Sequence, residues 1–146
     1  MTKNKAHKLL NLAGAIAQFS KDPSTQVGAV ILGPNGEGGP WGYNGAPRGC
    51  SADEDERVER PEKYFWMEHA ERNAIYTAAR TGFTTVGCTM VITHPPCMDC
   101  ARAIVQAGIK EVYWRIPSPE FEARWKEHSE RVHRLFYECQ VKYGTW

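Results

Sequence analysis

The sequence predicts an α/β fold, a three-layer α/β/α sandwich in which helices cover both faces of a mixed central sheet. Three observations lead to this prediction. A β-branched apolar stretch is followed by a turn and a second extended stretch, which indicates an antiparallel hairpin. Two further short apolar stretches alternate with helical patterns, as is typical of parallel strands joined by crossover helices. An amphipathic helix precedes the whole arrangement.

The amino-terminal half supplies the first helix and the hairpin. Apolar side chains recur every three or four positions over residues 3–20, at Leu9, Leu12, Ala13, Ile16 and Phe19. QVGAVIL (26–32) is apolar and β-branched, so we expect a buried strand, and GPNG is a turn sequence. Residues 37–45 should return as an edge strand, because Pro40 cannot donate a ladder hydrogen bond. Residues 46–66 are polar, and we expect a long exposed loop there.

The carboxyl-terminal half alternates helix and strand. MEHAERNAIYTAAR (67–80) is a strong helix that ends at Gly82, and PCMDCARAIVQAG (96–108) opens with proline and stops at glycine. We expect strands over 88–93 and 110–114. A last helix should then carry one face of core or subunit-interface residues, namely Phe121, Trp125, His128, Val132 and Leu135. The pattern leaves open whether CQVKY adds a final strand.

Composition favours a soluble globular chain with a small-molecule partner. The 146 residues correspond to about one domain, so we expect a single domain over 1–146. With 18 basic and 17 acidic side chains, the net charge of +1 offers no footprint for a nucleic acid polymer or a membrane. No export signal or apolar run of membrane-spanning length is visible, so we expect a cytoplasmic location. The five cysteines, two of them in a CxxC, favour metal or redox chemistry over a disulfide framework.

Two fragments, HAE (69–71) and PCMDC (96–100), hold side chains suited to one metal ion. Cys97 and Cys100 are three apart at the predicted start of a helix, which places both sulfurs on one face and favours thiolates. With His69 they supply three zinc ligands and leave a fourth position open, as in catalytic zinc sites. His69 and Glu71 would point about 200° apart inside a regular helix. We therefore expect His69 to lie at the helix entrance, where both side chains can face the metal.

Each fragment alone has an ordinary explanation. A CxxC can be a redox pair or half of a structural zinc site, and an HxE is commonly a solvated helix pair. Their order here, H-x-E followed by P-C-x-x-C, is the signature of zinc deaminases. A zinc-dependent binding module without turnover needs no carboxylate beside an open coordination position, so Glu71 favours an enzyme.

Four stretches carry a more specific resemblance: SKDPSTQVGAVI, GYNGAPRG, HAERNAIYTAARTG and PPCMDCARAIVQAGIKEVYW. Together, over roughly residues 13–114, they resemble the deoxycytidylate (dCMP) deaminase family, and the compact length resembles phage-encoded members such as those of cyanophages. The resemblance implies the cytidine deaminase fold, one catalytic Zn²⁺ per chain, and hydrolytic conversion of dCMP to dUMP, which supplies dTMP synthesis; a phage-encoded enzyme would work in the host cytoplasm. The loop 46–66 offers only Cys50, so we expect no second, structural zinc.

The expected chemistry combines the substrate that the resemblance implies with the chemistry of these residue types. A zinc-activated water attacks C4 of cytosine, while Glu71, which is not a ligand, passes the water proton to N3 and then to the departing amine. Substrate contacts are less visible. Asn44 is a candidate for a sugar hydroxyl, with a turn between two glycines as its alternative role. Arg48 and Lys21 are candidates for the phosphate, with ordinary surface charge as the alternative.

The segment Gly42, Tyr43, Asn44 and Gly45 resembles the family's effector-binding segment. This implies an allosteric homo-oligomer, expected to be a hexamer, that dCTP activates together with Mg²⁺ and that dTTP inhibits. Rival deaminases fit less well, because those acting on tRNA or single-stranded DNA need a basic surface, free cytidine deaminases lack GYNG, and riboflavin-pathway deaminases usually carry a second domain. The expected partners are therefore dCMP, dUMP, dCTP and dTTP.

Overall fold

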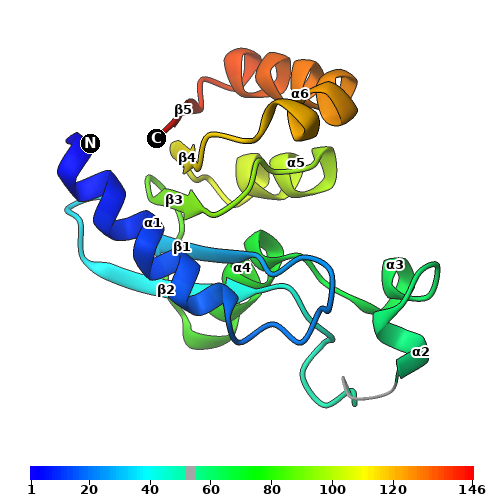
Figure 1. Cartoon of the computed structure of the whole chain (residues 1–146). Helices are drawn as coiled ribbons and strands as arrows, with labels where there is room; N and C mark the ends of the chain where they lie inside the picture. Colours follow the sequence, from blue (N-terminus) through cyan, green and yellow to red (C-terminus); the bar gives the residue numbers. More distant parts are fainter. Residues whose placement is uncertain (52–54) are drawn as a thin grey trace.

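The computed structural model describes residues 1–51 and 55–146, which form a five-stranded mixed sheet flanked by helices (Figure 1). The helices are α1 (Lys3–Ala17), α2 (Asp55–Val58), α3 (Lys63–Trp66), α4 (Ala70–Thr81), α5 (Met98–Gln106) and α6 (Pro119–Glu138). The strands are β1 (Gly28–Leu32), β2 (Gly38–Tyr43), β3 (Thr89–Ile92), β4 (Glu111–Trp114) and β5 (Lys142–Thr145). The predicted α/β class and mixed sheet are confirmed.

The strand order is β2-β1-β3-β4-β5, with β1 antiparallel to both neighbours and β3, β4 and β5 parallel. The crossover helices α5 and α6 join the parallel strands. The hairpin pairs Gly28 with Tyr43, and the backbone N–H of Thr93 donates to the carbonyl oxygen of Gly28 at 3.0 Å. The start of β1, the end of β2 and the carboxyl end of β3 therefore meet at one end of the sheet.

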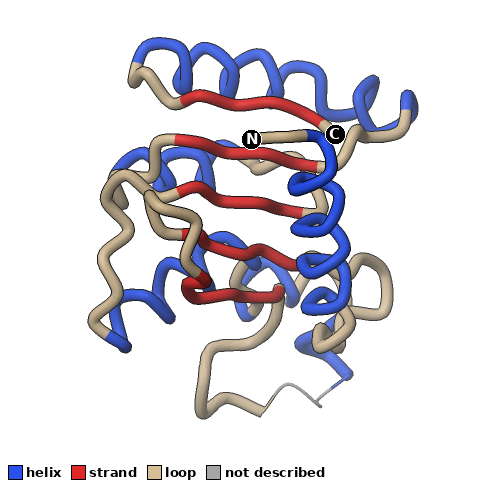
Figure 2. Tube along the Cα trace, turned by 90° about the vertical axis from the view of Figure 1, so that its left-hand side faces the viewer, coloured by secondary structure: helices blue, strands red, loops and turns tan. Residues whose placement is uncertain are grey.

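Alternating side chains of the strands divide the molecule into layers. Val30, Leu32, Val91 and Tyr113 face α1, which lies along one side of the ladder of strands (Figure 2). Gly28 lets α1 approach closely, since a Cβ there would stand 2.0 Å from the carbonyl oxygen of Ala13. The alternate residues of the same strands face α4, α5 and α6, so the sheet lies between two layers of helices.

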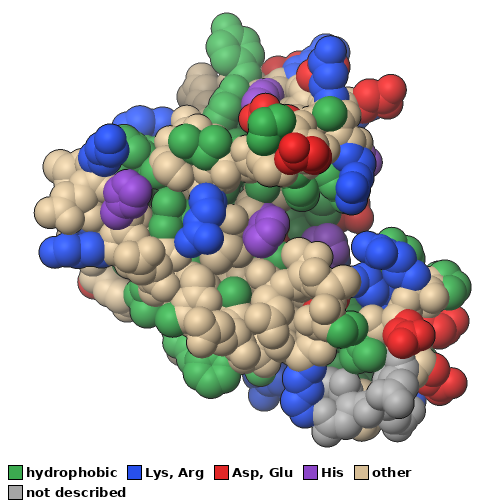
Figure 3. Space-filling model, viewed as in Figure 1, with side chains coloured by type: hydrophobic (Ala, Val, Ile, Leu, Met, Phe, Trp, Pro, Cys, Tyr) green, Lys and Arg blue, Asp and Glu red, His purple; other side chains and the backbone are tan. Residues whose placement is uncertain are grey.

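A lobe formed by α2 and α3 (residues 55–66) stands beside the sheet near the start of α4 (Figure 1). Figure 3 shows a hollow between this lobe and α5–α6, with a histidine side chain at its inner end. The lobe corrects the expectation of a plain loop over 46–66. Helices of four residues each are too short to show an apolar period in the sequence. Residues 52–54 of that predicted loop lie outside the described residues.

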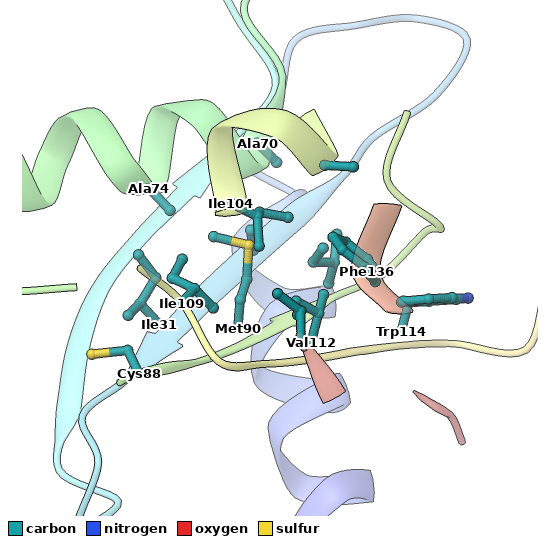
Figure 4. Packing of buried hydrophobic residues seen from close by; sticks show 14 of the residues in the cluster. Ile31, Ala70, Ala74, Cys88, Met90, Ile104, Ile109, Val112, Trp114 and Phe136 are labelled. Atoms are coloured by element: carbon teal, nitrogen blue, oxygen red, sulfur yellow. The ribbon is translucent and has the colours of Figure 1, made fainter. Parts of the chain in front are cut away.

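The main core lies between the sheet and α4–α6 (Figure 4). Its largest fully buried side chains come from β1, β3, α5, β4 and α6, and they include Phe136, Ile31, Met90, Ile104 and Val112. Burial of this apolar surface is the main favourable term in folding. The same core ties α4 and α5, whose first turns carry the candidate site, to the sheet.

The first helix corrects the predicted core face. Ala13 and Ile16 are buried as predicted, but Leu12 and Phe19 are 48% and 62% exposed, and Leu10 is the buried residue that the prediction lacked. Pro40 lies in β2, which is an edge strand as predicted. The open question about the tail is settled by β5, which pairs with β4. Among the described residues, no helix is both long and apolar enough to span a bilayer.

Candidate active site and metal centre

His69 stands at the entrance of α4, as the spacing to Glu71 requires. It is the N-cap residue, with an extended backbone (φ −79°, ψ 154°), and Glu71 follows in the first turn. The extended residue turns the imidazole away from the helical direction, so both side chains face the same space. Two backbone hydrogen bonds between Gly45 and Glu68, at 3.0 and 2.9 Å, hold the incoming chain.

The two cysteines stand in the same way at the start of α5. Cys97 is the N-cap residue, with φ −75° and ψ 171°, and Cys100 lies in the first turn. Their sulfur atoms lie 3.6 and 3.5 Å from Nδ1 of His69. A tetrahedral zinc with Zn–S of about 2.3 Å and Zn–N of about 2.0 Å separates sulfur and nitrogen by about 3.5 Å. The spacing of the three side chains therefore fits Zn²⁺.

The protonation of this cluster suits a cation. Hydrogen bonds from Cys100 and His69 lower the pKa of the Cys97 thiol to about 4, although burial opposes this. The hydrogen bond to Cys97, together with burial, raises the pKa of Cys100, so the two sulfurs share one proton. The hydrogen bond with Cys97 also raises the pKa of His69. A metal ion that binds here displaces these protons.

Glu71 is a buried carboxyl group at the wall of a cavity. Its residue is only 3% exposed, and burial raises its pKa. A carboxyl group with a raised pKa is suited to general acid–base catalysis near neutral pH, because it can both take up and release a proton.

The cluster opens into a cavity of about 560 Å³, a size typical of sites for small molecules. One wall comes from the β3–α5 loop with His94 and Pro96, and another from the α2–α3 lobe. This cavity lies in the hollow between the lobe and α5–α6 (Figure 3). The His69–Cys97–Cys100 cluster and the buried carboxyl group of Glu71 therefore lie together at the wall of this cavity.

Sequence reasoning missed the wall that α6 contributes. The ring of His94 lies 6.3 Å from that of Phe121, which stacks on Trp125 at 5.8 Å, and Trp125 contacts His128 at 5.1 Å. Phe121, Trp125 and His128 line the cavity, whereas Val132 further along α6 lies in the core. The predicted single apolar face of α6 is therefore divided: its first part lines the cavity, and its later part packs in the core. The four-residue spacing of the aromatic side chains just after β4 was the signal available in the sequence.

Asn44 lines the cavity, and its side-chain amide also holds the backbone. Oδ1 accepts a hydrogen bond from the N–H of Val27 at 2.7 Å, and Nδ2 donates to the carbonyl oxygen of Thr25 at 2.9 Å. The turn role is therefore present, and a second N–H of the amide is left for a ligand. The contact to a sugar hydroxyl stays a prediction.

Arg48 and Lys21 are not among the described residues that line this cavity. Arg48 donates from Nη2 to Oγ1 of Thr77 at 2.7 Å, two turns along α4 from Glu71. Lys21 lines a neighbouring open hollow of about 440 Å³, which shares Asp22 and Thr25 with the cavity. The structure places other cations at the cavity instead, namely Arg60, Lys63 and Arg72. The sequence of the polar stretch 46–66 does not indicate which of its charged side chains faces the cavity.

The chain also matches known proteins. The model of the cytidine and deoxycytidylate deaminase zinc-binding region matches residues 3–116. An uncharacterized deaminase of Aliivibrio fischeri is 39% identical over 146 residues, which covers 100% of this chain and 95% of that protein. The deoxycytidylate deaminase of enterobacteria phage T4 is 34% identical, with 75% of this chain and 77% of the phage protein covered.

The human deoxycytidylate deaminase is 44% identical over 101 residues, so 66% of this chain matches and 56% of the human protein is spanned. Among solved structures, the dCMP deaminase of cyanophage S-TIM5 superposes with a TM-score of 0.78 at 25% identity, with 100% of both chains covered. Family model, relatives and structural likeness agree with the geometry of the site. The chain belongs to the zinc-dependent cytidine and deoxycytidylate deaminase family.

Proposed function

We propose that this protein deaminates dCMP to dUMP by zinc-dependent hydrolysis, with release of ammonia, and so supplies dUMP for dTMP synthesis. The observation that carries the proposal is the cluster of His69, Cys97 and Cys100 with the buried Glu71 beside it, at the wall of a nucleotide-sized cavity. The likeness to the S-TIM5 enzyme, which was crystallised in complex with dCMP and dUMP, supports this choice of substrate.

One Zn²⁺ per chain, held by these three side chains, would supply the Lewis acid that activates a water molecule for attack on C4 of cytosine. Glu71 accepts one proton from that water and delivers it to N3 as oxygen adds to C4. It then takes the second proton from the new C4 hydroxyl and passes it to the amine, which leaves as ammonia when the C4–N bond breaks and the C4 carbonyl forms. Its raised pKa lets the carboxyl group hold the proton between these transfers. The amino-terminal end of α5 stabilises the thiolates of Cys97 and Cys100 through its partial positive charge.

The test is a panel of ammonia-release assays over dCMP, deoxycytidine, cytidine, dCTP, guanine and single-stranded DNA. We expect kcat/KM to be far higher for dCMP than for any other compound, because binding of the remote phosphate supports the chemistry at C4. Equal kcat/KM values for dCMP and deoxycytidine would contradict the nucleotide assignment. A preference for guanine or DNA would place the chain in another branch of the family.

We infer further that the enzyme is a homo-oligomer, with a hexamer as the expected form, activated by dCTP with Mg²⁺ and inhibited by dTTP. The Gly42–Gly45 segment supports this, because the backbone of Gly45 is hydrogen-bonded to that of Glu68, the residue directly before His69. Tyr43 also contacts the exposed rings of Phe19 and Trp41. A nucleotide that binds this segment better in one of two states would shift the start of α4.

The mass in solution and the dCMP saturation curve test this second proposal. With Mg²⁺, dCTP should turn a sigmoidal curve towards a hyperbola, and dTTP should oppose it. Hyperbolic curves indifferent to both nucleotides would leave a constitutive enzyme and remove the regulatory proposal alone. The phage relatives support a cytoplasmic location for the protein. If a phage encodes the chain, this is the cytoplasm of the host.

A further inference from the structure

A nucleoside monophosphate brings a phosphate dianion into the cavity, and some group of the wall has to bind it. This question rests on the proposed function, because a nucleoside would need no such group. Three cations with long side chains line the cavity, namely Arg60, Lys63 and Arg72. Three histidines do so as well, namely His69, His94 and His128.

Two of the three long cations already have acidic partners. Nζ of Lys63 lies 3.0 Å from Oδ2 of Asp22 and 2.8 Å from Oγ of Ser24, in an ion pair whose side chains are 12% and 9% exposed. Arg72 pairs with Glu68 through two of its nitrogens and reaches towards Asp99. Both positive charges are therefore compensated within the chain.

Two of the three histidines are also unsuited to binding the phosphate. His69 belongs to the metal cluster. The ring of His94 is hydrogen-bonded to Oγ1 of Thr93 at 3.0 Å, and burial, with the charge of Arg115, lowers its pKa, so it carries no charge at neutral pH. His128 contacts Trp125 edge to face, and it is the remaining histidine that could bind the phosphate in place of an arginine.

Arg60 is differently placed. Its Nε donates to the hydroxyl oxygen of Tyr64 at 2.7 Å, and no described residue gives it an acidic partner. That contact orients the guanidinium plane and leaves the four N–H groups of its two terminal nitrogens for a ligand. A guanidinium group matches two phosphate oxygens at once, which an ammonium group cannot do.

We propose that Arg60 binds the 5′-phosphate of the substrate and determines the preference for a nucleoside monophosphate over a nucleoside. Lys63 acts as a positioning residue, because its ion pair with Asp22 ties the α2–α3 lobe to the loop before β1. The lobe thereby presents Arg60 to the cavity, while the reacting base lies at the cluster across it.

The experiment compares kcat/KM for dCMP and for deoxycytidine in the zinc-loaded full chain and in two matched variants. Arg60→Gln should lower kcat/KM for dCMP by about 10- to 100-fold, the loss typical of a hydrogen-bonded charge pair, and should leave deoxycytidine unchanged. Arg57→Gln is the control. Arg57 belongs to the same lobe and loses the same charge, but its guanidinium lies 4.3 Å from the Trp66 ring centre and outside the cavity lining.

A competition assay with inorganic phosphate gives a readout without turnover of a nucleotide. Phosphate should inhibit deoxycytidine deamination by the parent and by Arg57→Gln, and it should do so much more weakly in Arg60→Gln. If Arg60→Gln keeps the full preference for dCMP, or if His128→Gln loses it instead, Arg60 is not the anchor and the proposal is overturned. If the parent itself shows no preference for dCMP, the proposed function fails first, and that result appears before any variant is measured.

Discussion

Gly42→Ala is the substitution whose effect on the site can be worked out most directly. A Cβ at Gly42 would stand 2.4 Å from the backbone nitrogen of Ala74, 2.5 Å from the carbonyl oxygen of Ala70 and 2.8 Å from the carbonyl carbon of Asn73. All three atoms belong to the backbone of the first turns of α4, so no side chain can move aside. The buried face of α4 in these turns is alanine, which is what lets β2 and the helix approach so closely.

The size of the displacement follows from these contacts. Ordinary van der Waals contact begins at 3.4 Å, so α4 has to move away from β2 by about 1 Å. Overpacking of this kind costs roughly 1–3 kcal/mol in the free energy of unfolding. The first turn of α4 carries Glu71 and follows His69, and a misplacement of about 1 Å can cost about 100-fold in rate.

The assays are thermal unfolding and kcat/KM for dCMP, with zinc content measured on the same samples. Gly38→Ala is the matched control, because it lies in the same strand and nothing stands within 4 Å of the added Cβ. We expect Gly42→Ala to lower Tm by roughly 3–10 °C and activity by about 100-fold, and we expect Gly38→Ala to behave like the parent. Equal Tm and activity in the two variants would refute the argument from close packing.

Three further predictions concern single side chains. Cys97→Ala should lose most of the bound zinc in a metal analysis, and full retention of zinc would mean that other groups hold the ion. Glu71→Gln should keep zinc and Tm while kcat falls by about 10²- to 10⁴-fold, because only the proton carrier is removed; near-normal turnover would assign proton transfer to another residue. Burial raises the pKa of Asp22, but hydrogen bonds from Ser24, Lys63 and Thr25 outweigh it and lower the pKa to about 2. The stabilisation by Asp22 is therefore complete above pH 4 and is lost as the pH falls towards 2. Unfolding of Asp22→Asn should accordingly depend less on pH than that of the parent over this window, and identical pH profiles would show that the ion pair contributes nothing.

The parts of the site that sequence could predict are those set by local geometry. The two-residue spacing of His69 and Glu71 excludes a regular helix at His69, and the structure has it at the N-cap with an extended backbone. Cys97 and Cys100 follow the same rule at the start of α5. Each inference needed only the helical repeat and the position of a helix start.

The parts that sequence could not predict depend on distant segments. Whether Arg48 or Arg60 faces the cavity is decided by the path of the chain through the α2–α3 lobe, whose helices are too short to show a pattern. The strand β5 is held by backbone pairing to β4 and has mostly exposed side chains, so its residues carry little apolar signal. The aromatic wall from α6 appears only once that helix is packed on α5.

The four longest helices in the described part of the chain begin in two different ways. Thr2 and Ser118 start α1 and α6 with a side-chain oxygen that accepts a hydrogen bond from the helix backbone. His69 and Cys97 hold the same position at α4 and α5 and give no such bond, and lack of a capping oxygen costs a helix about 1 kcal/mol. The chain thus gives up local helix stability at the two points where its proposed zinc ligands lie. A chelator should therefore loosen the first turns of α4 and α5 before it affects the sheet, and hydrogen exchange on the zinc-loaded and the zinc-free chain would show this order.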